Sequence, residues 1–108
     1  MAVVDVEIKR RVQVAKQTLM RLGTVRAAYI FGSHADGSAD RWSDIDIAVF
    51  MDGVEEWDIR RRARAMVQVQ KDAGLEVEAH LFSASSHDHP ARGSFAEYVL
   101  KHGIRVVD

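Results

Sequence analysis

The residues of this chain best placed to do chemistry are a Gly-Ser pair and two aspartates that follow it. Ten residues separate Gly32 and Ser33 from Asp44, and Asp46 follows two positions later. Side chains alternate across a strand, so Asp44 and Asp46 should share one face. Two carboxylates so close repel each other unless a cation neutralises them, and a hard cation such as Mg²⁺ is the simplest explanation. The spacing predicts a divalent-metal site beside a turn that can cradle phosphate.

A third carboxylate is expected, because paired metal ions that clamp the oxygens of a phosphoryl or nucleotidyl transfer usually need one. Segment 75–82 is the candidate strand. Its alternation places Leu75, Val77, Ala79 and Leu81 on the core face and Glu76, Glu78 and His80 on the other. We select Glu78 as the third carboxylate and keep Glu76 as the alternative.

Two further segments are predicted to position these groups as strands. Segment 25–31 is rich in β-branched and aromatic residues and ends at the Gly-Ser turn. Segment 44–51 alternates, so that one face is apolar and the other carries the two aspartates. The apolar face consists of Ile45, Ile47, Val49 and Met51.

Helical periodicity predicts the remaining elements. A stripe of Ile8, Val12, Ala15, Leu19 and Leu22 indicates a helix that stops at Gly23 and packs on the sheet. A second helix is expected from near Glu55 to Gly74, with a buried stripe of Ile59, Ala63, Met66, Val69 and Ala73. A short helix at 95–100 and a strand at 103–107 close the chain. The fold class is therefore α/β in the broad sense (α+β).

The order and spacing of these motifs resemble those of the minimal nucleotidyltransferase (MNT) domains of the DNA polymerase β superfamily, over nearly the whole chain. The resemblance implies the nucleotidyltransferase fold, a mixed β-sheet with helices packed mainly on one face. It also implies that Gly32 and Ser33 hold a triphosphate, that Asp44 and Asp46 bind two Mg²⁺ ions, and that Glu78 completes the shell of the catalytic ion. All three carboxylates would be catalytic.

The chain departs from the pattern of many relatives at two places. An Arg often follows the Gly-Ser pair, where this chain has His34, Ala35 and Asp36, and an Asp often stands at the position of Glu78. The first change removes a cation from the phosphate site, and the second lengthens the carboxylate by one methylene. Both changes bear on turnover more than on binding.

The resemblance also implies a reaction and a partner. Stand-alone MNT proteins often pair with a helical HEPN toxin, an RNase, and act as antitoxins by transferring AMP from ATP to a tyrosine of that toxin. We therefore expect an adenylyltransferase with ATP as its substrate. Two alternatives stay open: a catalytically silent subunit that neutralises its partner by binding, and a nucleotidyltransferase acting on a small molecule or an RNA end.

Composition sets the remaining expectations. The length of 108 residues predicts a single domain over 1–108. A formal charge of −1 argues against direct nucleic-acid binding, and the chain has no cysteine for disulfides or thiolate zinc sites. We expect a cytoplasmic protein without a membrane segment. A homodimer is compatible with an open sheet edge, although no residue requires it.

Three other features have competing interpretations. One is an arginine cluster, which consists of Arg60, Arg61, Arg62 and Arg64. We interpret it as a solvated helix face rather than a binding surface, because Glu56 and Asp58 stand four residues before two of these arginines. His87 and His89 lack further ligands at fixed spacing, which disfavours zinc. His80 either orients Glu78, touches phosphate or is a half-exposed strand residue, and Trp42 either stacks on a base or caps its loop.

Overall fold

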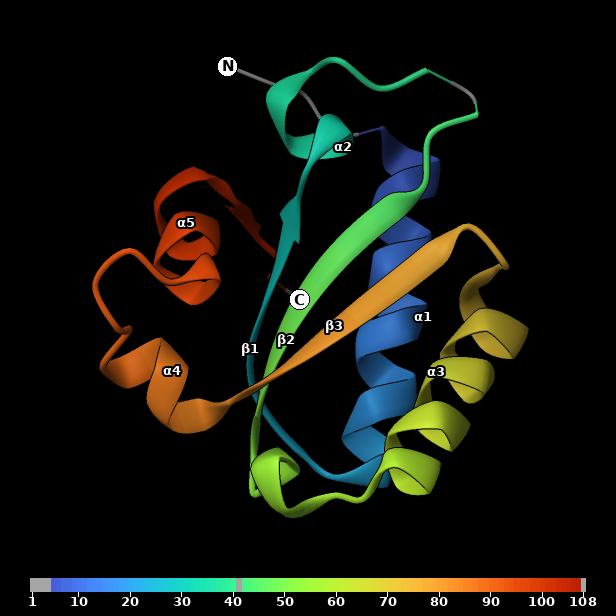
Figure 1. Ribbon diagram of the computed structural model, residues 1–108. Coiled ribbons are helices and arrows are strands. Elements are labelled where there is room, and N and C mark those ends of the chain that lie inside the picture. Colours follow the sequence, from blue (N-terminus) through green and yellow to red (C-terminus); the bar gives the residue numbers. More distant parts are fainter. Residues whose placement is uncertain (1–4, 41, 108) are drawn as a thin grey trace.

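A four-stranded mixed sheet forms the centre of the molecule (Figure 1). The computed structural model describes residues 5–40 and 42–107. The strands lie in the order β3-β2-β1-β4, with bounds Thr24–Phe31 for β1, Ile45–Asp52 for β2, Val77–Ser83 for β3 and Ile104–Arg105 for β4. β1 is antiparallel to both of its neighbours, whereas β2 and β3 run parallel. The predicted strands are thus all present, and the predicted mixed sheet is confirmed.

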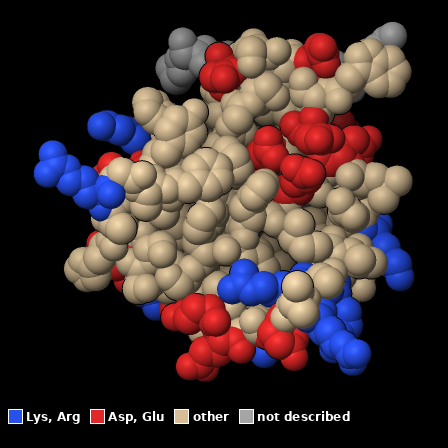
Figure 2. Space-filling model, viewed as in Figure 1, with Lys and Arg blue, Asp and Glu red and all other residues tan. Residues whose placement is uncertain are grey.

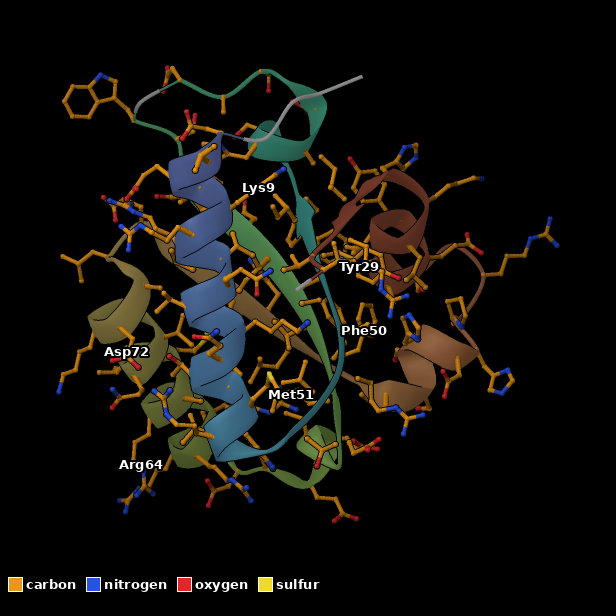
Figure 3. The ribbon with its side chains drawn as sticks, turned by 180° about the vertical axis from the view of Figure 1, so that it is seen from behind. Lys9, Tyr29, Phe50, Met51, Arg64 and Asp72 are labelled. Carbon is orange, nitrogen blue, oxygen red and sulfur yellow. The ribbon has the colours of Figure 1, made fainter. Side chains whose placement is uncertain are left out.

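The two long helices cover one face of this sheet (Figures 1 and 3). α1 spans Val6–Leu22 and α3 spans Ile59–Ala73. Both begin at an aspartate that accepts a hydrogen bond from a backbone N–H in the first turn, and both end at a glycine. Their buried residues join the inward side chains of the strands in one aliphatic core that includes Val12, Ala15, Leu19, Ile47, Val49, Val69 and Val77. This packing confirms the predicted core face of segment 44–51.

The predicted start of the second long helix is wrong. A 3-10 turn, η1, occupies Val54–Glu56, and the chain then extends through Trp57, which is buried in the core. The α-helix begins only after Asp58. As a result the first turn is rotated relative to the prediction, so that Ile59 is exposed and Ala65 is buried. Burial of the large Trp57 side chain outweighs the helical propensity of the preceding residues.

Two other predicted core positions are exposed. Leu22, at the last turn of α1, is partly exposed because the chain turns away there at Gly23. Leu75 is 81% exposed, because it lies in the connection between α3 and β3 and the strand starts two residues later. The alternation of segment 75–82 therefore holds only from Val77 onward.

The pairing of β1 with β2 contains a β-bulge. The register shifts between Val25 and Ala27, so Arg26 is the extra residue on β1. Val25, Ala28 and Ile30 nevertheless contact the same aliphatic core. Because side chains alternate strictly along a regular strand, the bulge is what brings Val25 to the same side as Ala28.

Two short helices lie against the opposite face of the sheet. α4 spans Ala84–Asp88 and α5 spans Phe95–His102. They enclose a second apolar cluster of Ala27, Tyr29, Phe31, Ala48, Phe50, Ala96 and Val99. Figure 1 shows that they leave the starts of β2 and β3 uncovered on this face. Among the described helices, none combines the length and apolarity that crossing a bilayer demands.

Candidate active site

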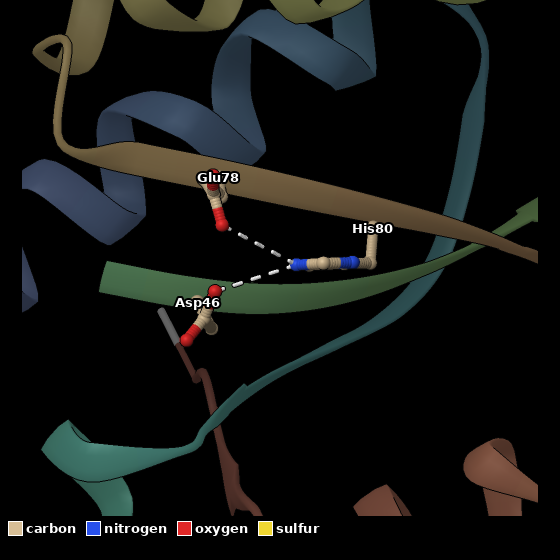
Figure 4. A group of neighbouring side chains, drawn as sticks. All are labelled: Asp46, Glu78 and His80. Atoms are coloured by element: carbon tan, nitrogen blue, oxygen red, sulfur yellow. Dashed lines mark hydrogen bonds and ion pairs between the residues drawn. The ribbon is translucent and has the colours of Figure 1, made fainter. Parts of the chain in front are cut away.

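Two carboxylates lie side by side at the uncovered starts of β2 and β3 (Figure 4). The parallel register places Asp46 of β2 directly opposite Glu78 of β3. Side chains at paired positions project to the same face, so both carboxylates lie on the face opposite the aliphatic core. One oxygen from each and a ring nitrogen of His80 lie within 4.8 Å of one another. Register between two neighbouring strands therefore builds the centre of the site.

The neighbouring Asp46 carboxylate changes the titration of Glu78. A hydrogen bond with Asp46, then burial, then repulsion by Asp46 and Asp44 raise the pKa of Glu78 above its usual range. Figure 2 shows acidic side chains gathered over the starts of β2 and β3, with no lysine or arginine between them in this view. Without a cation, Glu78 is thus easier to protonate than an isolated glutamate.

His80 is the third member of the group and follows Glu78 by two residues on the same face. Its Nε2 atom lies 3.4 Å from Oδ1 of Asp46 and 4.0 Å from Oε2 of Glu78. The other side of the imidazole packs against Phe31, with ring centroids 5.1 Å apart. The imidazole is therefore oriented toward both carboxylates and lies closer to Asp46 than to Glu78, while the orienting role predicted for His80 on Glu78 stays a prediction.

Glu76, the alternative third carboxylate, is engaged elsewhere. It lies before β3 and forms an ion pair with Arg11 of α1, at 3.1 Å between Oε2 and Nη1. A hydrogen bond to its own backbone N–H and the Arg11 guanidinium lower the pKa of Glu76. The structure places Glu78, and not Glu76, beside Asp46.

The Gly-Ser pair lies next to Asp46. Phe31, the last residue of β1, pairs with Asp46, so Gly32 follows at the edge of the site. Gly32 has φ +74°, and a Cβ atom there would lie 2.9 Å from Oδ2 of Asp46. Both the backbone conformation and the close carboxylate require glycine. Ser33 then begins a short helix, α2, that spans Ser33–Asp36.

Asp44 lies close to the group but outside it. It immediately precedes β2 and is exposed, and its charge contributes to the raised pKa of Glu78. Among the described residues, the group with ligand atoms within 4.8 Å of one another consists of Asp46, Glu78 and His80. The roles predicted for Asp44 as a metal ligand and for Gly32 and Ser33 as phosphate ligands stay predictions. So does a stacking role for Trp42, which lies exposed in the loop before β2.

The remaining candidates lie away from this group. His87 of α4 packs against Tyr29, with 3.2 Å between Nε2 and the phenolic oxygen, and does not approach His80 as a metal ligand. In the arginine cluster, Asp58 accepts a hydrogen bond from the backbone N–H of Arg61. The Arg61 guanidinium stacks on the Trp57 ring, 4.0 Å from its centroid. These contacts stabilise the start of α3.

Sequence reasoning missed an aromatic cluster that adjoins the carboxylates. Phe31, His80 and Phe95 meet edge to face, and Phe82 contacts Phe95. These residues come from β1, β3 and α5. The available signal was that His80 and Phe82 fall on the non-core face of segment 75–82, but nothing in the pattern indicated that Phe31 and Phe95 join them.

With this geometry in view, comparison with known proteins identifies the family. Residues 13–108 match the family model described as polymerase beta, nucleotidyltransferase. The chain belongs to this nucleotidyltransferase family. The fold is similar to that of a crystal structure of a "putative nucleotidyltransferase" from Sulfolobus solfataricus, with a TM-score of 0.51 and 23% identity over 82% of this chain and 83% of that chain. No curated protein matched the sequence. The predicted superfamily and fold class are confirmed.

The donor set of this nucleotidyltransferase domain fits a divalent cation. Asp46 and Glu78 offer oxygen atoms that Mg²⁺ and Mn²⁺ prefer, and His80 adds a nitrogen that suits transition metals. The pKa of Glu78 is raised by its hydrogen bond with Asp46, by burial and by the negative charge of Asp46 and Asp44, and a bound cation would neutralise that charge. All three side chains are partly exposed, so an ion can reach them from solvent.

Proposed function

We propose that this domain transfers AMP from ATP to a hydroxyl acceptor in a reaction that depends on a divalent metal, Mg²⁺ before others. The observation that carries the proposal is the register that places Asp46 opposite Glu78, beside the turn at Gly32. Membership of the nucleotidyltransferase family supports the reaction class. Two carboxylates that face each other on an uncovered part of the sheet serve no evident packing purpose.

The reaction exchanges a phosphoanhydride bond of ATP for a phosphodiester bond to the acceptor. The acceptor oxygen forms a bond to the α-phosphorus while the bond from that phosphorus to the bridging oxygen of the β-phosphate breaks, and pyrophosphate leaves with the electron pair. Glu78 accepts the proton of the acceptor hydroxyl. Asp46, Glu78 and Asp44 would hold two Mg²⁺ ions, which supply neutralisation of the charge that develops on the phosphate oxygens.

Each protein group has a defined part in binding. The backbone at Gly32 and the Ser33 hydroxyl would hold the β- and γ-phosphates, at a point adjacent to Asp46. His80 keeps the Asp46 carboxylate oriented through its Nε2 atom. The aliphatic core under β2 and β3 keeps both strands in register, and with them the spacing of the carboxylates.

For the acceptor we propose a tyrosine of a helical HEPN-type toxin, which makes this domain the antitoxin of a toxin–antitoxin pair. The support is the resemblance to stand-alone MNT proteins together with the open carboxylate site, which a second protein can approach. A short all-helical protein encoded by the neighbouring gene, with an Arg-x₄-His motif, is the partner to test.

The test combines the purified domain, that neighbouring protein, Mg²⁺ and ATP labelled in the α-phosphate. Label on a partner tyrosine is the expected result, and EDTA should abolish it. Tight association without label would instead support a silent neutralising subunit. Label that appears only on an aminoglycoside or an RNA end would refute the antitoxin assignment while keeping nucleotidyl transfer.

A further inference from the structure

An aromatic surface continues from the carboxylates across the second face of the sheet. We define it as Phe31, Phe82, Phe95 and Tyr98, of which Phe31 and Phe95 contact His80. Phe95 lies at the centre, with its ring centroid 5.2 Å from Phe31, 5.9 Å from Phe82 and 6.1 Å from Tyr98. The rings come from β1, β3 and α5, so the tertiary fold assembles the surface.

The outer part of this surface is open to solvent. Phe95 is 47% exposed and Tyr98 is 50% exposed, whereas Phe31 below them is buried. Phe95 stands nearly perpendicular to Phe31, at 87°, and nearly parallel to Tyr98, at 24°. Edge-to-face packing on the buried ring restrains Phe95 while one side of the cluster stays accessible. A restrained and exposed aromatic ring is well suited to stack with a flat ligand.

The position of Phe95 relative to the carboxylates indicates which ligand the aromatic surface can bind. His80 joins the two regions, because its ring centroid lies 6.4 Å from that of Phe95 and its Nε2 atom lies 3.4 Å from Asp46. A phosphate held near Asp46 and a planar group held on Phe95 would therefore both lie beside His80. A nucleoside triphosphate carries both groups in one molecule.

We propose that Phe95, supported by Phe31 and Tyr98, forms the stacking site for the base of the nucleotide. This inference rests on the proposed nucleotidyl transfer and adds a base-binding residue to it. Stacking accepts any base, because every base has a π face. The site should therefore bind purine nucleotides with similar affinity, and hydrogen bonding to the base edge is not required for binding.

The test measures binding of two ligands that cannot react. α,β-Methylene-ATP carries the base and inorganic tripolyphosphate lacks it, and both are titrated calorimetrically in Mg²⁺. Phe95→Ala should weaken binding of the ATP analogue about tenfold or more, which is the usual effect of losing an aromatic partner for one base. Tripolyphosphate affinity should not change.

Three further variants sharpen the result. Phe95→Leu keeps an apolar side chain without the π face and should also weaken the ATP analogue, whereas Phe95→Trp should restore its binding. Ile59→Ala removes another exposed apolar side chain, at the start of α3 on the other side of the sheet, and should have no effect. Circular dichroism melting checks that each variant is folded.

The outcomes separate this inference from the proposed function. Equal affinity of wild type and Phe95→Ala for the ATP analogue would overturn the stacking site while keeping nucleotide binding. A parallel loss of tripolyphosphate binding would also overturn it, because Phe95 would then act on the phosphate region. If the wild-type domain bound neither ligand, the proposed function would itself be refuted.

Discussion

The two faces of the sheet are built for different tasks. The face under α1 and α3 is an aliphatic core in which Ile47, Val49 and Met51 of β2 are fully buried. The opposite face of the same strand carries Asp46 at its start and Phe50 further along, and only short helices cover it. One strand thus contributes packing on one side and chemistry on the other. The closed face should determine stability, and the open face should determine binding and reaction.

The largest expected effect is on the open face. Asp46→Asn should lower nucleotidyl transfer more than about a thousandfold, because charge neutralisation by a bound metal is worth several kcal/mol. Thermal stability should stay unchanged or rise, since a repelling charge is removed. The measurement is transfer of labelled AMP alongside a thermal melt.

Asp52→Asn is the matched control for that variant. Asp52 is the last residue of β2, is exposed and lies 3.5 Å from Arg26. The Asp52→Asn variant should transfer AMP at the same rate as the wild type. Normal transfer by Asp46→Asn would show that the carboxylates on the open face are not catalytic.

The next effect belongs to the closed face. Leu19 is fully buried between α1 and the sheet, so Leu19→Ala should reduce the free energy of unfolding by about 2–5 kcal/mol through lost burial and the cavity that remains. Urea denaturation measures this loss. Met20→Ala, one residue along and 53% exposed, should cost far less. At temperatures where Leu19→Ala stays folded, its affinity for nucleotide should equal that of the wild type; weaker binding would mean that the two faces are coupled.

Alanine substitutions at Gly32 and Gly37 can test how closely the backbone at Gly32 approaches the Asp46 carboxylate. Gly32 and Gly37 both have positive φ, +74° and +86°, so alanine should cost each about 1–2 kcal/mol of stability. Only at Gly32 does the added Cβ meet Asp46, because nothing lies within 4 Å of it at Gly37. Gly32→Ala should therefore also weaken metal binding, measured by calorimetry with Mn²⁺. Equal metal affinity in the two variants would contradict the close approach.

The smallest effect concerns the pH dependence of stability without metal. The pKa of Glu78 is raised in the folded state. Its favourable contribution to the free energy of unfolding is therefore fully present below about pH 4, and it is lost as the pH rises through the folded-state pKa. Glu78→Gln should thus be more stable than the wild type at pH 7, by less than about 1 kcal/mol for a half-exposed group, and the difference should shrink toward pH 4. Melting curves across this range test the sign.

Glu76→Gln is the comparison for the pH experiment. The pKa of Glu76 is lowered, so its contribution is present at neutral pH and is lost on acidification. This variant should be less stable than the wild type at pH 7. The two glutamates, two residues apart, should therefore shift stability in opposite directions.

Sequence patterns predicted the strands and placed Glu78 on the same face of the sheet as Asp46, because alternation is a local property that survives in the fold. They failed where a distant contact decided the local structure. Trp57 delays the start of α3 by filling the core, and the turn before β3 leaves Leu75 in solvent. The aromatic surface was not predicted, for a related reason. Phe95 contacts Phe31, which is 64 residues away in the sequence, and no periodicity of the sequence predicts that contact.

The bulge at Arg26 constrains how this chain can change in length. Val25 precedes the bulge and Ile30 follows it. The portions of β1 before and after the bulge contribute side chains to the same core only because one additional residue stands between them. A deletion at position 26 would force the side chains of one portion of β1 to point to the opposite face of the sheet. Either Val25 would leave the interior, or Phe31 and Gly32 would lose their alignment with Asp46. We therefore expect insertions and deletions to be tolerated in the loop before β2 and rejected in β1, where a single residue sets the phase of the whole hairpin.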